Sequence, residues 1–301
     1  MEKIKVAIIG TGNIGTDLLV KILREDCMEL IAFVGRRKES PGIQFALEMG
    51  VPVYWSGIKF FTTNPGACDV VYDCTDADSA RAHAKIFKDQ GIRVIDLTPA
   101  KVGEMCVPSI NANAICKNDN VNMITCGGQA TLPLINLVSE NCDELKYVEL
   151  VSQIASKSAG MATRINIDSY IHTTEEAIKK FTNCLDCKII LNLNPAEPCV
   201  DMQTTIFIKA ENINFDNMLA AIKDKIISIK EYVPNYELIL PPVINDQNIL
   251  VFSVRVQGLG DYLPKYAGNL DIINCASIEV TKKLWESKKI MGEQNYDDHP
   301  K

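Results

Sequence analysis

The stretch IKVAIIGTGNIG at residues 4–15 decides the fold of the first half of the chain. It joins an apolar strand-like run to glycines spaced G-x-G-x-x-G, and an amphipathic helical pattern follows at residues 16–24. In this context the first glycine permits a tight turn, the second lets a pyrophosphate approach, and the third lets the helix pack closely. A glycine-rich turn that binds nothing is the alternative. The predicted dinucleotide contacts are Gly10, Thr11, Gly12, Asn13, Ile14 and Gly15.

Outward from this stretch, short β-branched runs alternate with helical patterns through the first 125 residues. Such alternation is typical of an α/β fold with a Rossmann-type, doubly wound parallel sheet. The expected strands lie at residues 4–9, 30–34, 51–55, 69–74, 92–97 and 121–125, and a further helix is expected at 78–90.

After residue 125 the strands become longer, which predicts an α+β domain with a largely antiparallel sheet. Its strands are expected at 147–154, 204–209 and 249–257, and helices at 126–140, 174–184, 215–230 and 270–284. We therefore expect a dinucleotide-binding domain at 1–125 onto which a C-terminal helix at 269–290 packs, a second domain at 126–268 and a polar tail at 291–301.

The composition is that of an ordinary globular protein, with 47% hydrophobic and 23% charged residues. The net charge of −7 argues against nucleic-acid binding, because clustered Lys and Arg supply that affinity. No apolar run reaches the roughly 18–20 residues that span a bilayer, and no signal peptide is evident, so we expect a cytoplasmic protein. The eleven scattered cysteines indicate reduced thiols, and the pair Cys184 and Cys187 lacks the further ligands of a zinc site.

The residues after the second strand bear on the cofactor. NAD-selective sites place an acidic residue there, whereas this chain has Gly35, Arg36 and Arg37. Arg36 suits a 2′-phosphate or stacking on adenine, and a solvated basic turn is the alternative. Both NAD and NADP therefore remain open as the cofactor.

Cys126 is the candidate nucleophile. It lies where an apolar strand meets a helix that begins with two glycines. The dipole and backbone N–H groups of a helix N-terminus are expected to lower the pKa of a thiol and to hold a developing oxyanion. A small buried hydrophobic side chain is the alternative for any one cysteine.

Four separated blocks carry a family resemblance. They read NMITCGGQAT at 122–131, SKSAG at 156–160, NPAEP at 194–198 and YAGNLD at 266–271. Together they make the chain resemble the bacterial acylating acetaldehyde dehydrogenases of aromatic-hydrocarbon catabolism, from Lys5 to about Ile278. The resemblance implies a fold similar to glyceraldehyde-3-phosphate dehydrogenase, with a catalytic and dimerisation domain at 126–268.

The resemblance also implies a chemistry. Cys126 would attack a short aldehyde, the thiohemiacetal would reduce NAD(P), and coenzyme A would resolve the thioester. A homodimer and a partner 4-hydroxy-2-oxovalerate aldolase are likewise implied. Further cofactor contacts would be Ser158, Ala159, Gly160, Thr163, Arg164, Asn166 and Asn269.

The chain departs from the family pattern at two more positions besides Arg36. Thr204 occupies the place of the family's activating aspartate, so that Asp201, or water and the helix dipole, would have to serve, or activity would be reduced. The segment 160–164 reads GMATR where the family has GPGTR, which puts its local backbone in question.

Other residues have ordinary structural interpretations. His83 is expected on a surface helix, His172 is expected to be exposed, and His299 falls in the tail. Asp76 and Asp78 could line the cleft or cap a helix. Lys283, Lys288 and Lys289 could meet coenzyme A phosphates or form a solvated face. The competing functions are a semialdehyde dehydrogenase with another acyl acceptor and a weakly active cofactor-binding partner of an aldolase.

Overall fold

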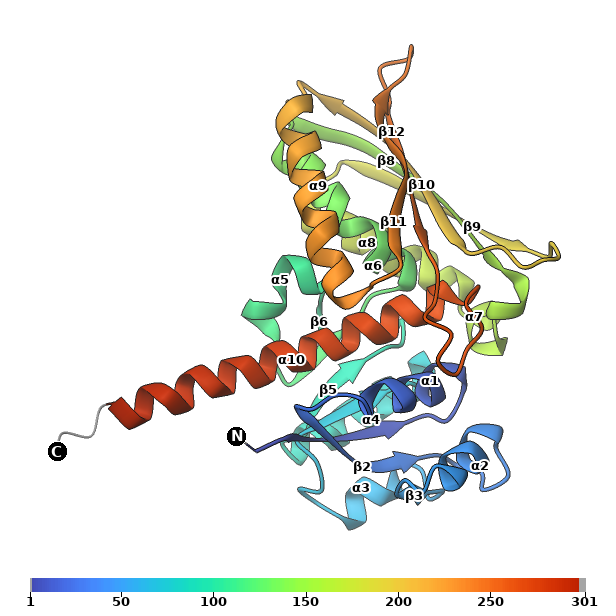
Figure 1. Cartoon of the computed structure of the whole chain (residues 1–301), viewed down its shortest axis with the longest axis vertical. Coiled ribbons are helices and arrows are strands. Elements are labelled where there is room, and N and C mark those ends of the chain that lie inside the picture. The colour runs from blue at the N-terminus through green and yellow to red at the C-terminus, as the bar shows by residue number, and fades with distance from the viewer. Residues whose placement is uncertain (1, 298–301) are drawn as a thin grey trace. The chain divides into compact units, whose positions relative to one another are not determined.

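The computed structural model describes residues 2–297, without the side chains of 161–162 and 290–297 (Figure 1). It divides into two compact units. The first contains the chain up to Met123 together with the segment from Ala276, and the second runs from Ile124 to Cys275.

The first unit is built on a seven-stranded sheet in the order β3-β2-β1-β4-β5-β7-β6, in which every pairing is parallel. The strand order reverses between β1 and β4. Sheets of this kind bind ligands at such a reversal, next to the carboxyl ends of the strands. This confirms the Rossmann-type prediction. The strands are β1 (Ile4–Ile9), β2 (Met28–Val34), β3 (Val53–Tyr54), β4 (Val70–Asp73), β5 (Arg93–Asp96), β6 (Glu104–Met105) and β7 (Asn120–Asn122).

The helices of this unit begin at residues that suit helix N-termini. Ser40 accepts a hydrogen bond from the Ile43 backbone N–H and is followed by Pro41, a good first helical residue. The helices are α1 (Asn13–Ile22), α2 (Pro41–Glu48), α3 (Lys59–Thr63), α4 (Ala77–Asp89) and α5 (Pro108–Ile115).

The second unit contains a five-stranded mixed sheet in the order β11-β12-β10-β8-β9. Only the β8–β9 pairing is parallel, which confirms the largely antiparallel prediction. Alternate residues of β10 are buried, as expected where helices cover one face of a sheet. Its elements are α6 (Cys126–Glu140), β8 (Glu144–Ala155), η1 (Ser156–Ser158), α7 (Met161–Ile165), α8 (Ile167–Thr182), β9 (Asp186–Asn194), β10 (Met202–Glu211), α9 (Phe215–Tyr232), β11 (Tyr236–Ile244) and β12 (Leu250–Val256).

The last helix, α10 (Gly268–Asp297), begins in the second unit and continues in the first. Within the first unit Tyr72 and Thr281 share a buried hydrogen bond of 2.6 Å, which ties α10 to β4. The tail expected from residue 291 is helical as far as Asp297, because its Glu and Gln residues are good helix formers. Residues 298–301, with His299, lie outside the described residues.

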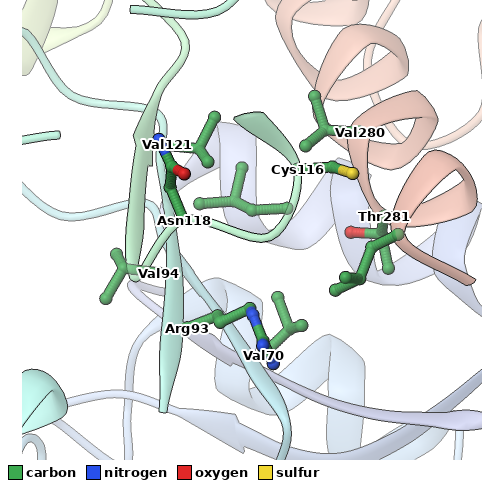
Figure 2. Close-up of a pocket in the computed structure, with 10 residues that line it drawn as sticks. Val70, Arg93, Val94, Cys116, Asn118, Val121, Val280 and Thr281 are labelled. Atoms are coloured by element: carbon green, nitrogen blue, oxygen red, sulfur yellow. The ribbon is translucent and has the colours of Figure 1, made fainter. Parts of the chain in front are cut away.

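A small cavity lies between this sheet and α10 (Figure 2). Its volume of about 10 Å³ is near the minimum for one water molecule, and apolar atoms line it. It is a packing gap too small for a substrate. Within residues 2–297, the helices are too short or too polar to cross a lipid bilayer.

Candidate active site

The glycine turn after β1 has the geometry that an anion site needs. Gly10 has φ 107°, and a Cβ there would lie 2.5 Å from the Cys74 carbonyl oxygen. A Cβ at Gly15 would lie 1.9 Å from the carbonyl oxygen of Gly10. At Gly12, by contrast, a Cβ would meet nothing within 4 Å, and no side chain caps α1 there. The helix N-terminus is thus open to an approaching phosphate.

Strand pairing brings the Arg36 turn next to the glycine turn. β1 and β2 are parallel, with Ile9 opposite Val34, so the residues that follow both strands emerge at one edge of the sheet. Thr11 Oγ1 lies 3.1 Å from Ser40 Oγ, which links the two turns directly. Arg36 is exposed at this edge, as a residue that contacts a ribose or its phosphate must be.

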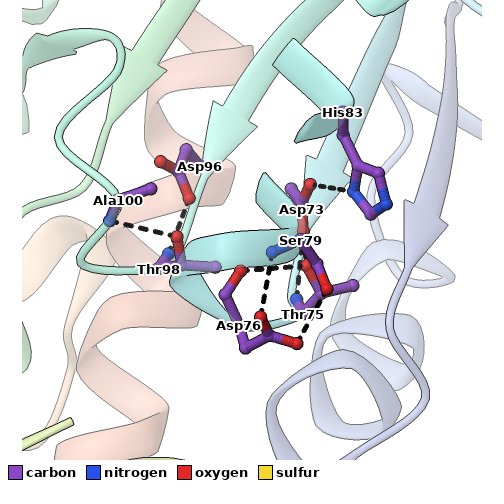
Figure 3. A network of polar contacts seen from close by, with 8 residues as sticks. All are labelled: Asp73, Thr75, Asp76, Ser79, His83, Asp96, Thr98 and Ala100. Carbon is purple, nitrogen blue, oxygen red and sulfur yellow. Dashed lines mark hydrogen bonds and ion pairs between the residues drawn. The ribbon is translucent and has the colours of Figure 1, made fainter. Parts of the chain in front are cut away.

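A polar network follows the carboxyl ends of β4 and β5 (Figure 3). His83 Nδ1 lies 2.8 Å from Asp73 Oδ2, and the imidazole side chain is only 12% exposed. α4 is a surface helix, as predicted, but His83 lies on the side of this helix that meets the end of β4. Asp96 accepts hydrogen bonds from the Thr98 backbone N–H and from Asn122 Nδ2. Burial raises the pKa of Asp96 to about 7, although these hydrogen bonds act in the opposite direction.

The acidic residues after β4 cap α4. Asp76 accepts a 2.9 Å hydrogen bond from the Ser79 backbone N–H, and that bond holds the pKa of Asp76 below its usual value. Asp78 is exposed and forms an ion pair of 2.6 Å with Arg81. Of the two interpretations of Asp76, the structure supports helix capping.

Cys126 is the first residue of α6 and follows a strained turn. The preceding strand ends at Asn122, earlier than predicted, because Ile124 adopts φ 63°. A left-handed β-branched residue costs about 1–3 kcal/mol and persists only where its surroundings enforce it. Thr125 is the N-cap: its hydroxyl accepts from the Gly128 N–H at 3.0 Å and lies 2.8 Å from Thr174 Oγ1.

One hydroxyl group lies beside the Cys126 thiol, and two more lie behind it. Tyr170 from α8 places its hydroxyl beside the thiol and beside Gly127, and Ser152 Oγ is hydrogen-bonded to Thr204 Oγ1 at 2.8 Å. Burial raises the pKa of Cys126 to about 11, while the Tyr170 hydroxyl and the backbone N–H groups of Gly127 and Cys126 oppose the rise. The predicted lowering of this pKa is wrong, because burial outweighs the helix N-terminus.

The segment that follows β8 is held by its own arginine. Arg164 Nε donates to the Ala159 carbonyl at 3.0 Å, and Nη2 donates to the Ser156 carbonyl at 3.0 Å and to its hydroxyl at 2.9 Å. Ser158 Oγ donates to the Ala155 carbonyl. These bonds hold the backbone of residues 155–164 in place. The guanidinium of Arg164 therefore stabilises the segment to which it belongs.

The three later sequence blocks meet at one end of the second unit. Ala155 and Asn194 pair in register at the ends of the parallel strands β8 and β9. Lys157 forms an ion pair with Glu197, and the Tyr266 hydroxyl acts on the same ammonium group. Segments far apart in the sequence therefore build one surface.

Asn269, near the start of α10, is 2% exposed, and its Oδ1 has no hydrogen-bond partner among the described residues. A Cβ at Gly268 would lie 2.0 Å from the Val256 carbonyl oxygen, so the helix starts directly against β12. A buried carbonyl oxygen without a partner is costly, and an amide N–H of a ligand would satisfy it.

Comparisons with known proteins agree with this geometry. Residues 5–118 match the family described as semialdehyde dehydrogenase, NAD binding domain, and residues 126–264 match prokaryotic acetaldehyde dehydrogenase, dimerisation. Acetaldehyde dehydrogenases from Spirochaeta aurantia and Geobacillus stearothermophilus are 48% and 42% identical; the matches cover 94% and 96% of this chain and 95% and 98% of theirs. The chain belongs to the acetaldehyde dehydrogenase family. As a member, it is an oxidoreductase that acts on an aldehyde with a nicotinamide cofactor.

The fold comparison is consistent with membership of the acetaldehyde dehydrogenase family. Aspartate semialdehyde dehydrogenase II from Vibrio cholerae has a TM-score of 0.66 at 12% identity, covering 94% of this chain and 98% of that one. The Candida albicans aspartate semialdehyde dehydrogenase, solved with NADP, has a TM-score of 0.64 at 13% identity, covering 94% of this chain and 100% of that one. The predicted fold class is confirmed.

Neither residue considered as the thiol's base places a carboxylate beside Cys126. Thr204 is 1% exposed and offers only a hydroxyl. The Asp201 carboxylate lies 3.3 Å from Gln257 Nε2, and no carboxylate of the described residues acts on the Cys126 thiol. The side chain that does act on the thiol is Tyr170, with Ser152 next to it, and the sequence patterns missed both residues because no local motif surrounds them.

The remaining candidates have structural roles in this family member. His172 is 68% exposed, as predicted. Lys283 pairs with Glu279 and Glu286, which fits a solvated helix face. All eleven cysteines are free thiols; Cys184 and Cys187 are buried and bond to backbone carbonyls.

Proposed function

We propose that this chain is an acylating acetaldehyde dehydrogenase, which oxidises a short aldehyde with NAD(P)⁺ and transfers the acyl group to coenzyme A. The position of Cys126 carries the proposal. It is the one half-buried residue in an otherwise buried run from 121 to 135, and it begins α6. This partial exposure sets Cys126 apart from its buried neighbours as the residue that a small carbonyl compound would meet.

Cys126 acts as the nucleophile. Its sulfur adds to the aldehyde carbon, the C=O π electrons move to oxygen, and the thiol proton leaves to solvent, which gives a thiohemiacetal. Backbone N–H groups at the N-terminus of α6 stabilise the negative charge on that oxygen. When bound, NAD(P)⁺ accepts a hydride from this carbon, so that a thioester remains on Cys126.

Coenzyme A completes the reaction as the acyl acceptor. Its sulfur adds to the thioester carbonyl carbon, the bond from that carbon to Cys126 breaks, and the coenzyme A thiol proton returns the cysteine to its neutral form. The acyl group leaves as acyl-CoA.

The residues present fit a dinucleotide. Gly12 and the open start of α1 would hold the pyrophosphate, Arg36 the adenosine ribose, and Asn269 Oδ1 the carboxamide N–H of the nicotinamide. The bonds of Arg164 would keep the second segment in shape. The proposed contacts are Gly10, Thr11, Gly12, Asn13, Ile14, Gly15, Arg36, Ser158, Ala159, Gly160, Thr163, Arg164, Asn166 and Asn269.

The partners in this proposal follow from the family. The match of residues 126–264 to a dimerisation domain supports a homodimer. A 4-hydroxy-2-oxovalerate aldolase that supplies the aldehyde, within aromatic-hydrocarbon catabolism, rests on the sequence resemblance. A cytoplasmic location agrees with eleven free thiols, since such compartments keep cysteines reduced.

The test combines kinetics with mass spectrometry. Wild-type protein with acetaldehyde and NAD(P)⁺, but without coenzyme A, is expected to carry an acetyl group on Cys126. Added coenzyme A should then restore turnover, whereas phosphate should not. Cys126→Ser is expected to reduce turnover by at least about 10³-fold, because a serine hydroxyl in this position is a far weaker nucleophile.

Cys142→Ser is the matched control. Cys142 is a half-buried thiol of the same unit, and its sulfur lies 3.8 Å from the Ser139 carbonyl oxygen, a contact that a serine can also make. Turnover by this variant should be unchanged. Coenzyme A-dependent turnover that survives in Cys126→Ser would refute the proposal.

A further inference from the structure

A buried tyrosine hydroxyl lies at the proposed nucleophile without an ordinary hydrogen bond. Tyr170 is 8% exposed, and its hydroxyl has no partner of normal geometry among the described residues. A Cβ at Gly127 would come within 2.1 Å of this oxygen, so the glycine after Cys126 leaves the space that the hydroxyl occupies. Buried polar groups are almost always paired, so an unpaired one calls for an explanation, and a role in the reaction is one such explanation.

The hydroxyl belongs to a row of three. Ser152 and Thr204 lie directly opposite each other on β8 and β10, and their side-chain oxygens are 2.8 Å apart. Both residues are 1% exposed, and the Ser152 hydroxyl also acts on Tyr170. Each hydroxyl in such a row can donate to the next, which polarises the last one towards its acceptor. Of the three hydroxyls, that of Tyr170 is the one that acts on the Cys126 thiol.

The protonated phenol of Tyr170 can act as a donor to the thiol. Burial and the neighbouring Cys126 raise the pKa of Tyr170 well above its usual value, so the phenol keeps its proton throughout the physiological range. Among the described residues, Tyr170 is the titratable side chain whose interaction lowers the pKa of the Cys126 thiol against the effect of burial.

We propose that Tyr170 is a positioning residue that donates its hydroxyl hydrogen bond to the Cys126 thiolate, with Ser152 and Thr204 supporting the donor. The thiolate is the missing acceptor of the unpaired phenol. Thr204 then serves as the far end of a hydroxyl row, a role that needs no carboxylate. The inference rests on the proposed function, since it assigns the bond to the same nucleophile.

The experiment is alkylation of Cys126 by iodoacetamide as a function of pH, read by mass spectrometry of the Cys126 peptide. It uses the full chain without aldehyde, cofactor or coenzyme A. Tyr170→Phe is expected to slow the alkylation of Cys126 about 10- to 100-fold at each pH at which the protein is folded, because hydrogen bonds to charged acceptors are the stronger ones and their loss lowers the thiolate fraction. At neutral pH the variant should lose about 10- to 100-fold in kcat/KM and recover part of it at higher pH.

Tyr236→Phe is the matched control. Tyr236 is a fully buried tyrosine of the same unit, and its hydroxyl donates to the Ala130 carbonyl of α6 at 2.7 Å. Its loss should lower the melting temperature and leave the alkylation rate of Cys126 unchanged, whereas Tyr170→Phe should melt near the wild type. An unchanged alkylation rate in Tyr170→Phe, or an equal loss in Tyr236→Phe, would overturn the inference. Because alkylation requires no turnover, that result is independent of the Cys126→Ser test.

Discussion

The glycine turn at residues 10–15 and the Cys126 turn both connect a parallel strand to a helix. The first leaves its helix N-terminus open, whereas the second encloses it. At the first, glycines supply the positive φ and the close packing, and the helix start has open space and no side-chain cap. At the second, Ile124 supplies the positive φ under strain, Thr125 caps the helix, and the flanking residues are buried.

The difference lies in what each helix N-terminus has to receive. A pyrophosphate is large and brings its own charge, so the first turn must leave room and unscreened dipoles. A thiol is small and belongs to the protein, so the second turn must hold it still. Its N-cap and strained residue fix the direction of one side chain at a cost in backbone free energy.

Gly15→Ala tests the first turn and should have the largest effect. The new Cβ would overlap the Gly10 carbonyl, a backbone atom that cannot move aside alone. We expect the free energy of unfolding to fall by about 3 kcal/mol, measured by denaturant titration, with loss of cofactor binding. Gly12→Ala, whose Cβ has open space, should keep the stability, and equal losses in both variants would contradict this account.

Arg36→Asp tests which dinucleotide the first turn receives. Replacing the cation by a carboxylate removes a contact to a 2′-phosphate and offers one to a ribose hydroxyl. The ratio of kcat/KM for NADP⁺ to that for NAD⁺ should fall about 10- to 100-fold. Arg24→Asp, a change of the same charge away from this edge, is the control; an unaltered ratio in Arg36→Asp would assign Arg36 to a solvated turn.

Thr125→Ala tests the cap of the second turn and should have the smallest effect. The variant leaves the Gly128 N–H without its acceptor, which should cost about 1 kcal/mol in thermal or denaturant unfolding. Thr125→Ser keeps the hydroxyl and should lie close to the wild type. If both variants unfold alike, the cap does not stabilise α6.

The sequence predicted those features that depend on neighbouring residues. The spacing of Gly10, Gly12 and Gly15 after an apolar strand is a local pattern, and so is the passage from strand to helix at Cys126. The alternation of strand and helix was enough for the fold class, because each βα unit is contiguous.

Contacts between distant segments could not be predicted in the same way. Tyr170 meets Cys126 because α8 packs against α6, and Ser152 meets Thr204 through the register of β8 and β10. The pairing of His83 with Asp73 likewise depends on how α4 is rotated over β4, which no local pattern specifies. The sign of the Cys126 pKa shift likewise follows from burial, which no short motif encodes.

The raised pKa of Cys126 has a consequence for the resting protein. Because burial raises the pKa of Cys126 to about 11, the resting thiol keeps its proton at neutral pH. Peroxides attack the thiolate and not the thiol, so a protonated cysteine is the form that resists conversion to sulfenic acid and mixed disulfides. The burial that disfavours the reactive thiolate is thus also expected to protect the resting side chain from oxidation.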